Sequence, residues 1–302
     1  MTTDKRKRRA GYRPPGTAHS VPSTEAAPRR AGLFGSFLRA DPSLSPYPTL
    51  RSVCGSPVVM ATIAVLVFAL RLLLVALQIP PRGAVFAATL ALPPIGTVLD
   101  LQAAGTIFGD ATGLVVAPAF LLVRSIVLAV LSGLVVESLR TGRASRLGAL
   151  RGLRGFPPIF GIGVIELGAV FIGSLVIGFT GLGLVGVIVV LVATLFFFGY
   201  APIVAVRETR GLAWTARKTI RAARIPGSQN IFLALIYTVP GLLMLPVLIP
   251  SGQGIAANPS IGTWIGILVA NVFHVVFLGV YCHRYLVAEA EIPDPPEDRR
   301  RH

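Results

Sequence analysis

The chain has 302 residues, of which 53% are hydrophobic and only 14% carry a charge. Soluble globular domains carry about 25% charged residues, so this composition excludes an ordinary soluble protein and predicts a polytopic membrane protein. The net charge is +15, and the two cysteines, Cys54 and Cys282, belong to no metal-binding pattern. We therefore expect two free thiols.

Residues 1–50 are predicted to form a disordered, basic, cytoplasmic tail. They are rich in proline, serine, alanine and arginine and lack apolar periodicity, apart from a weak helical pattern at 31–40. The basic run at 5–9 has no folded nucleic-acid-binding module beside it. A role in topology or lipid contact is favoured there, and no nucleic acid is expected as a partner.

Six apolar runs follow, each long enough for the roughly 20 residues that a helix needs to cross a bilayer. They cover residues 57–78, 112–136, 158–179, 183–206, 230–250 and 262–287. We therefore predict an all-α domain with about six transmembrane helices over residues 51–290. A short charged C-terminal tail is expected at 291–302.

The apolar segment 79–111 is interrupted by two pairs of prolines, at 80–81 and 93–94. Two interpretations are open: an external loop with a short helix, which we favour, and a re-entrant piece. In the favoured interpretation Asp100 and Asp110 are solvated loop acids, because no histidine or third carboxylate accompanies them.

Lysine and arginine are distributed asymmetrically between the two sides of these spans. Cations gather before the first span, at 140–154, at 207–224 and near the C-terminus, whereas the other three connections hold only Arg82. Because cytoplasmic loops carry an excess of lysine and arginine, both termini and both basic connectors are predicted to be cytoplasmic. The expected location is the plasma (inner) membrane of a bacterium, with the chain crossing it several times.

The two basic connectors are predicted to contain amphipathic helices at the cytoplasmic surface. On a helical wheel, the cations of 210–224 fall on one side and the apolar residues on the other. Such a helix suits the interface, where cations approach anionic lipid headgroups and a tryptophan lies at the same level. The predicted headgroup contacts are Arg210, Trp214, Arg217, Lys218, Arg221 and Arg224 on the second connector and Arg151 and Arg154 on the first. A purely topological role, with nonspecific lipid contact, is the open alternative.

Ionisable and amide side chains inside predicted spans are candidates for function, because they are costly there. They are Arg71, Arg124, Glu166, Asn271 and His274. We expect an ion pair between Arg124 and Glu166, which lie at similar depths on neighbouring antiparallel spans; Arg71 either joins the same glutamate or reaches the interface. The pair either fixes the helix register or forms a site for an anion or proton, and His274 either joins two helices or relays a proton.

The stretch FFFGYAPIVAVRETRGLAWTARKTIRAARIPGSQNIFLALIYTV, at residues 196–239, resembles a diffuse family of bacterial six-span proteins. These are the YciC-like proteins and the membrane domain attached to some glycerophosphodiester phosphodiesterases. The likeness covers about residues 57–290, with 139–153 as the corresponding first connector, and rests on Tyr200, Pro202, Glu208, Gly211, Ala216 and Thr219. It implies a six-span topology without catalysis, since the membrane domain is not the catalytic part of those fusions. Only about 15 residues follow the last span, so no attached catalytic domain is expected.

The sequence contains no motif for catalysis or for binding a metal or cofactor. The G-x-G-x-x-G match at 181–186 links two spans and lacks the strand and helix that surround a dinucleotide site. We therefore expect no enzyme, no metal and no cofactor. The favoured function is that of a noncatalytic membrane protein that contacts anionic lipid or a protein partner at the cytoplasmic leaflet. The alternative is a small transporter or channel for a lipid or an anionic solute.

Overall fold

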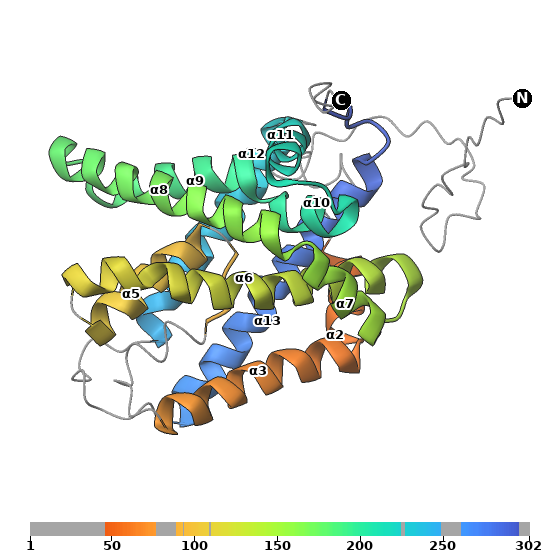
Figure 1. Ribbon diagram of the computed structural model, residues 1–302, viewed down its shortest axis with the longest axis horizontal. Helices are drawn as coiled ribbons and strands as arrows, with labels where there is room; N and C mark the ends of the chain where they lie inside the picture. Colours follow the sequence, from red (N-terminus) through yellow and green to blue (C-terminus); the bar gives the residue numbers. More distant parts are fainter. Residues whose placement is uncertain are drawn as a thin grey trace, which may run out of the picture.

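The computed structural model of the chain describes residues 46–76, 89–92, 94–108, 110–224, 227–248 and 261–295. In this part of the chain every regular element is a helix, which confirms the predicted all-α class (Figure 1). Most of the predicted N-terminal tail, including 31–40, and the last residues of the predicted C-terminal tail, 296–302, lie outside the described residues.

The helices have clear start and stop signals. In chain order they are α2 (Tyr47–Cys54), α3 (Pro57–Ala76), α5 (Ile95–Phe108), α6 (Asp110–Thr141), α7 (Arg146–Arg154), α8 (Phe156–Thr180), α9 (Gly183–Phe198), α10 (Ala201–Glu208), α11 (Leu212–Ala223), α12 (Gly227–Leu248) and α13 (Ile261–Ala288). Proline stands in the first turn of α8 and α10, where its missing N–H has no intrahelical partner to lose. Between α8 and α9, Gly181 and Gly183 have positive φ angles of 67° and 51°, so the glycines of 181–186 serve a tight turn.

Four predicted spans correspond to helices long and apolar enough to cross a membrane. These are Val115–Thr141, Phe156–Thr180, Val185–Glu208 and Ile261–Ala288. A fifth exists if Tyr47–Cys54 and Pro57–Ala69, which are bent by 69° at their junction, count as one span. The predicted span at 230–250 falls on the 22-residue helix α12, in which the stretch with described side chains, Gln229–Leu242, is apolar. The described residues thus account for four or five of the six predicted spans.

The outer surface of the bundle suits lipid rather than water. Over its most apolar window α8 is only 28% buried. Large apolar side chains line its exposed side, and Ile172 and Phe179 are 62% and 90% exposed. A soluble monomer rarely exposes so continuous an apolar surface, so acyl chains are the fitting surroundings for this helix.

α6 is the central helix of the bundle. It contacts α5, α7, α8, α10 and α13, and 61% of its most apolar window is buried. In Figure 1 it runs through the middle, with α8 and α9 on one side and α3 on the other, and α13 crosses it diagonally. Leu131 and Leu134 of α6 belong to the same buried apolar cluster as Leu278 and Tyr281 of α13. Whatever is attached to α6 is therefore held in a fixed position.

The proline-interrupted segment before α6 is buried rather than external. Residues 89–92 form no regular secondary structure, and α5 follows and packs along α6. Ile95, Leu99 and Ala103 recur at helical spacing and are at most 1% exposed, so they attach α5 to the core. Asp100 is only 2% exposed, and the prediction that it is a solvated loop acid is wrong. The side chain of Asp110 and residues 77–88 lie outside the described residues.

The two cysteines provide a test of the predicted membrane orientation. Cys54, at the end of α2, is exposed, whereas Cys282 is buried in α13, and both are free thiols. Ser52 of α2 bonds Ser138 near the end of α6 at 2.7 Å, which places Cys54 beside the basic connectors. We expect a membrane-impermeant maleimide to label one thiol per chain in inverted membrane vesicles and none in intact spheroplasts. Cys54→Ser should abolish labelling, and labelling from outside would contradict the predicted topology.

Candidate functional site

Both basic connectors lie at one end of the bundle, which we call the basic end. It comprises the last turns of α6, then α7, α10, α11 and residues 289–295. α7 contacts both α6 and α10, and Figure 1 shows these elements opposite the α8–α9 turn. This convergence agrees with the prediction that both connectors face the same side of the membrane.

α7 is fixed against α6 by a capped turn and by close glycine contacts. The Glu137 carboxylate of α6 accepts hydrogen bonds from the N–H and the hydroxyl of Ser145, the N-cap of α7, at 2.7 and 2.9 Å. Gly133 of α6 lies so close to Gly148 and Gly152 of α7 that a Cβ atom on Gly133 would overlap their backbone atoms. These contacts determine where the arginines of α7 stand.

A polar pocket of about 280 Å³ lies between α6, α7 and α10. Its ionisable lining residues are Glu137, Arg140, Arg151, Arg154 and Arg207. Arg140, Arg151 and Arg154 are exposed and form no hydrogen bond or ion pair with any described residue. Of the four arginines that line the pocket, Arg151 and Arg154 are predicted headgroup contacts. The other two were missed, because they come from different helices and meet α7 only in the folded chain.

The backbone at the edge of this pocket is strained. Thr209, which also lines the pocket, ends α10 with φ 49° and ψ 37°, in the left-handed region. A β-branched residue is rare there, and such strain costs about 1–3 kcal/mol. The turn ends α10 beside α7 and leads the chain toward α11.

α11 has one buried side and one exposed basic side. The buried side consists of Thr215, Lys218, Thr219, Ala222 and Ala223. Arg210, Arg217 and Arg224 are exposed, as headgroup contacts should be. Trp214 is half-buried, with the Arg210 guanidinium 5.8 Å from its ring centre. The exposed side of the helix therefore keeps most of the predicted headgroup contacts.

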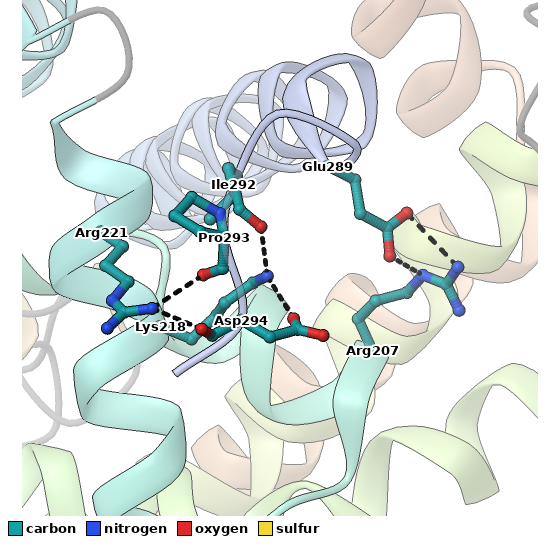
Figure 2. A network of polar contacts seen from close by, with 7 residues as sticks. All are labelled: Arg207, Lys218, Arg221, Glu289, Ile292, Pro293 and Asp294. Atoms are coloured by element: carbon teal, nitrogen blue, oxygen red, sulfur yellow. Dashed lines mark hydrogen bonds and ion pairs between the residues drawn. The ribbon is translucent and has the colours of Figure 1, made fainter. Parts of the chain in front are cut away.

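Lys218 and Arg221 bind the C-terminal segment, as Figure 2 shows. Lys218 is 2% exposed, and its Nζ donates to the Ile292 carbonyl and to Asp294 Oδ1, both at 2.7 Å. Arg221 donates to the carbonyls of Pro293 and Asp294. The prediction that Lys218 contacts headgroups is wrong, because the chain after α13 folds back and covers this side of α11. Arg221 is likewise engaged by protein atoms.

Arg207 connects the pocket to the C-terminal segment. Its Nε lies 3.1 Å from Glu289 Oε1, and the two side chains are 29% and 22% exposed (Figure 2). A partly exposed ion pair of this kind contributes about 0–1 kcal/mol. Arg207 is therefore shared between the pocket and a weak contact that a stronger anion can displace.

A buried polar network beneath α11 was not anticipated from the sequence. Arg284 of α13 donates through Nε to Asn230 Oδ1 at 2.7 Å, and the Tyr200 hydroxyl donates to the same oxygen at 2.6 Å. Asn230 in turn donates to the Ala223 carbonyl at 2.7 Å, which satisfies the end of α11. Two sequence signals pointed to it: the polar Asn230 at the start of an apolar run, and the charged Arg284 inside the predicted span at 262–287.

Within the bundle, Arg124 pairs with Asp100 and not with Glu166. Its Nη2 lies 2.7 Å from Asp100 Oδ1, and its Nε donates to both carboxylate oxygens at 2.8 and 2.9 Å. The predicted pair with Glu166 is wrong, because α5 brings the carboxylate of Asp100 to Arg124. Asp100 had been predicted to lie in an external loop.

Polar side chains of the bundle hold the non-helical residues 89–92. Arg124 donates a hydrogen bond to the carbonyl of Thr89. The side-chain oxygen of Asn271 accepts one from the N–H of Leu90, and the hydroxyl of Tyr237 accepts one from the N–H of Leu92. The Tyr237 hydroxyl also lies 2.8 Å from His274 Nδ1, so His274 joins α13 to α12. Non-helical backbone in an apolar interior needs such partners. These residues therefore have a structural task in the described part of the chain.

Glu166 is the exception. It is 1% exposed, and neither of its carboxyl oxygens has a hydrogen-bond partner among the described residues. Leaving a buried polar group unpaired costs stability, so this residue is the strongest candidate for a function within the bundle. The side chain of Arg71 lies outside the described residues.

No protein-family model, curated protein or solved structure matches this chain. The likeness to the YciC-like family accordingly stays a prediction from the motif at 196–239. Among the described residues, no three histidine, cysteine or acidic side chains gather as a metal site would require.

The Arg124–Asp100 pair predicts a specific pattern in double-mutant cycles. Asp100→Asn and Arg124→Gln should each destabilise the protein by about 3–5 kcal/mol, because each leaves a buried group unpaired. Their combination should show a coupling energy of about 1–3 kcal/mol. Glu166→Gln and Arg124→Gln should instead add to within about 0.5 kcal/mol. Reversible unfolding in detergent measures all five variants, and equal coupling in both cycles would contradict the assigned pairing.

The contacts of Lys218 predict that it holds the C-terminal segment. Lys218→Met should speed amide hydrogen exchange of residues 289–295 by about tenfold or more, because a charge-assisted hydrogen bond is lost. Arg217→Met, on the exposed side of the same helix, is the matched control and should leave that exchange unchanged. Unaltered protection in Lys218→Met would show that the segment is held by other contacts.

Proposed function

We propose that this chain is a noncatalytic integral membrane protein of a bacterial inner membrane that binds anionic lipid at the cytoplasmic leaflet through its basic end. The observation that carries the proposal is the gathering of exposed arginines from two connectors at one end of an apolar bundle. The positive-inside rule supports assigning this end to the cytoplasm.

α7 has the composition of a helix that lies in the membrane interface. Leu147, Leu150 and Leu153 are 61%, 50% and 41% exposed, whereas Gly148 and Gly152, on the other side of this nine-residue helix, pack closely against α6. Exposed leucines at this level can enter the acyl boundary while the guanidinium groups of Arg151 and Arg154 reach phosphates. An exposed water-facing helix would have little use for three such leucines.

α11 adds a second contact surface for the same leaflet. Arg210, Arg217 and Arg224 are exposed on one side, with Trp214 next to them. A cation near an anionic leaflet contributes about 1 kcal/mol, and tryptophan favours the headgroup layer. Together the two connectors present a basic surface on folded, fixed helices.

A small transporter or channel is the second candidate, and the unpaired Glu166 favours it. A transport site needs several polar groups that are free to bind a solute. Arg124, Asn271 and Tyr237 are already committed to the backbone of residues 89–92. What remains without a hydrogen bond in the described interior is Glu166 and scattered hydroxyls such as those of Ser132 and Thr238, so we rank transport below lipid binding.

Native mass spectrometry of the full chain extracted in polymer nanodiscs tests the lipid-binding proposal. Anionic lipid should be enriched around the wild-type protein. The variant Arg210→Gln/Arg217→Gln/Arg224→Gln should lose about tenfold or more of that preference, because three cations contribute about 1 kcal/mol each.

The matched control removes the same charge elsewhere, through Arg299→Gln/Arg300→Gln/Arg301→Gln. It should retain most of the enrichment. Equal losses in both variants would show that the enrichment of anionic lipid depends only on the net charge of the protein. If a protein reproducibly co-purifies with the wild type and is lost from the α11 variant, the basic end binds that protein rather than lipid.

A further inference from the structure

The pocket between α6, α7 and α10 gathers more positive charge than the described protein balances. Four arginines and one glutamate line it, which gives 4 − 1 = +3 at neutral pH. The arginines come from three helices: Arg140 from α6, Arg151 and Arg154 from α7, and Arg207 from α10. They surround the cavity from three sides rather than lying along one flat face.

The single glutamate in the lining serves the protein scaffold. Both oxygens of Glu137 accept hydrogen bonds from Ser145, and the side chain packs over Gly148 without room for a Cβ atom there. Its position therefore follows from the turn between α6 and α7. Arg140, Arg151 and Arg154 are exposed and bond no described residue, so their guanidinium groups are available to an anion from outside the described chain.

From this geometry we infer that the pocket binds a terminal phosphate group, that is, a phosphomonoester. Such a group carries about −1.5 to −2 charges near pH 7 and three acceptor oxygens. The planar fork of arginine matches these oxygens in pairs. At about 280 Å³ the cavity lies at the lower end of the usual range for ligand sites, and it suits a headgroup phosphate rather than a whole lipid.

The phosphate can be carried by a lipid, such as phosphatidic acid, or by a soluble phosphorylated compound. The chemistry of recognition is the same in both cases. The inference deepens the proposed function, since it adds a specific site to a surface proposed to contact anionic lipid. The exposed leucines of α7 make the lipid source the first to test.

The test uses the full chain in phosphatidylcholine nanodiscs. Phosphatidic acid, phosphatidylglycerol or inorganic phosphate is added, and native mass spectrometry and thermal unfolding measure binding. Wild type should bind phosphatidic acid, which has a terminal phosphate, more strongly than phosphatidylglycerol, which has only a diester. Arg140→Gln/Arg151→Gln/Arg154→Gln should weaken this binding about tenfold or more, because charge-assisted hydrogen bonds are lost.

The matched control is Arg299→Gln/Arg300→Gln/Arg301→Gln, which removes the same charge from the C-terminal tail and should keep the phosphatidic acid preference. Equal weakening in both variants would overturn the pocket while leaving the proposed function in place. Equal binding of phosphatidic acid and phosphatidylglycerol by wild type would overturn the phosphomonoester. Failure of wild type to distinguish any anionic lipid from phosphatidylcholine would overturn both proposals. Stabilisation by inorganic phosphate without phosphatidic acid binding would support the pocket and assign it a soluble ligand.

Two further variants keep the test decisive if the triple glutamine variant folds poorly. Arg140→Lys/Arg151→Lys/Arg154→Lys keeps the charge and should still lose phosphatidic acid selectivity, because lysine lacks the planar fork. Glu289→Gln frees Arg207 from its ion pair and should strengthen binding by up to about fivefold. Weaker phosphatidic acid binding by Glu289→Gln would show that Arg207 does not bind the phosphate, and would contradict the inference.

Discussion

The need to satisfy polar backbone inside an apolar bundle shapes the centre of this protein. Residues 89–92 form no regular secondary structure, and Ala91 and Leu92 lie in the apolar core, so several N–H and C=O groups of this segment lack a helical partner. Arg124, held by Asp100, supplies one partner, and Asn271 and Tyr237 supply two more. Because Asp100 stands on α5 and Arg124 on α6, the same pair fixes α5 along the central helix.

This arrangement changes how the intramembrane polar residues are understood. A charged residue in a span suggests a transport or proton site when it is considered alone. Here the charge of Arg124 is neutralised by a buried carboxylate, and its remaining donor reaches a backbone carbonyl. Arg124 and Asp100 thus serve to build the bundle. Glu166 differs from them, because its carboxyl group has no hydrogen bond to a described residue.

Hydropathy and charge predicted the helical class, most of the long helices and the convergence of the two connectors, because these features depend on local sequence. The partners of single side chains depend on distant segments and were predicted poorly. Asp100 lies in a segment broken by prolines, which resembled a loop although the chain returns to the core at Ile95. On an ideal helical wheel Lys218 belongs to the basic side. In the structure it donates hydrogen bonds to Asp294 and to the carbonyl of Ile292, which lie more than 70 residues later in the chain. The pocket has no counterpart in the sequence, since Arg140, Arg151 and Arg207 meet only after α7 folds onto α6.

The basic end has more structure than membrane topology requires. The positive-inside rule counts cations near the ends of spans and is satisfied equally by arginines on an unstructured loop. In this chain the first connector is capped by Ser145, is fixed to α6 through glycines, and is brought against the strained turn at Thr209. Bringing arginines together opposes their mutual repulsion, which a loop would relieve by spreading them apart. A fold that holds unbalanced cations around a cavity favours binding an anion, and the ion pair of Arg207 with Glu289 places the C-terminal segment where it would compete with that anion.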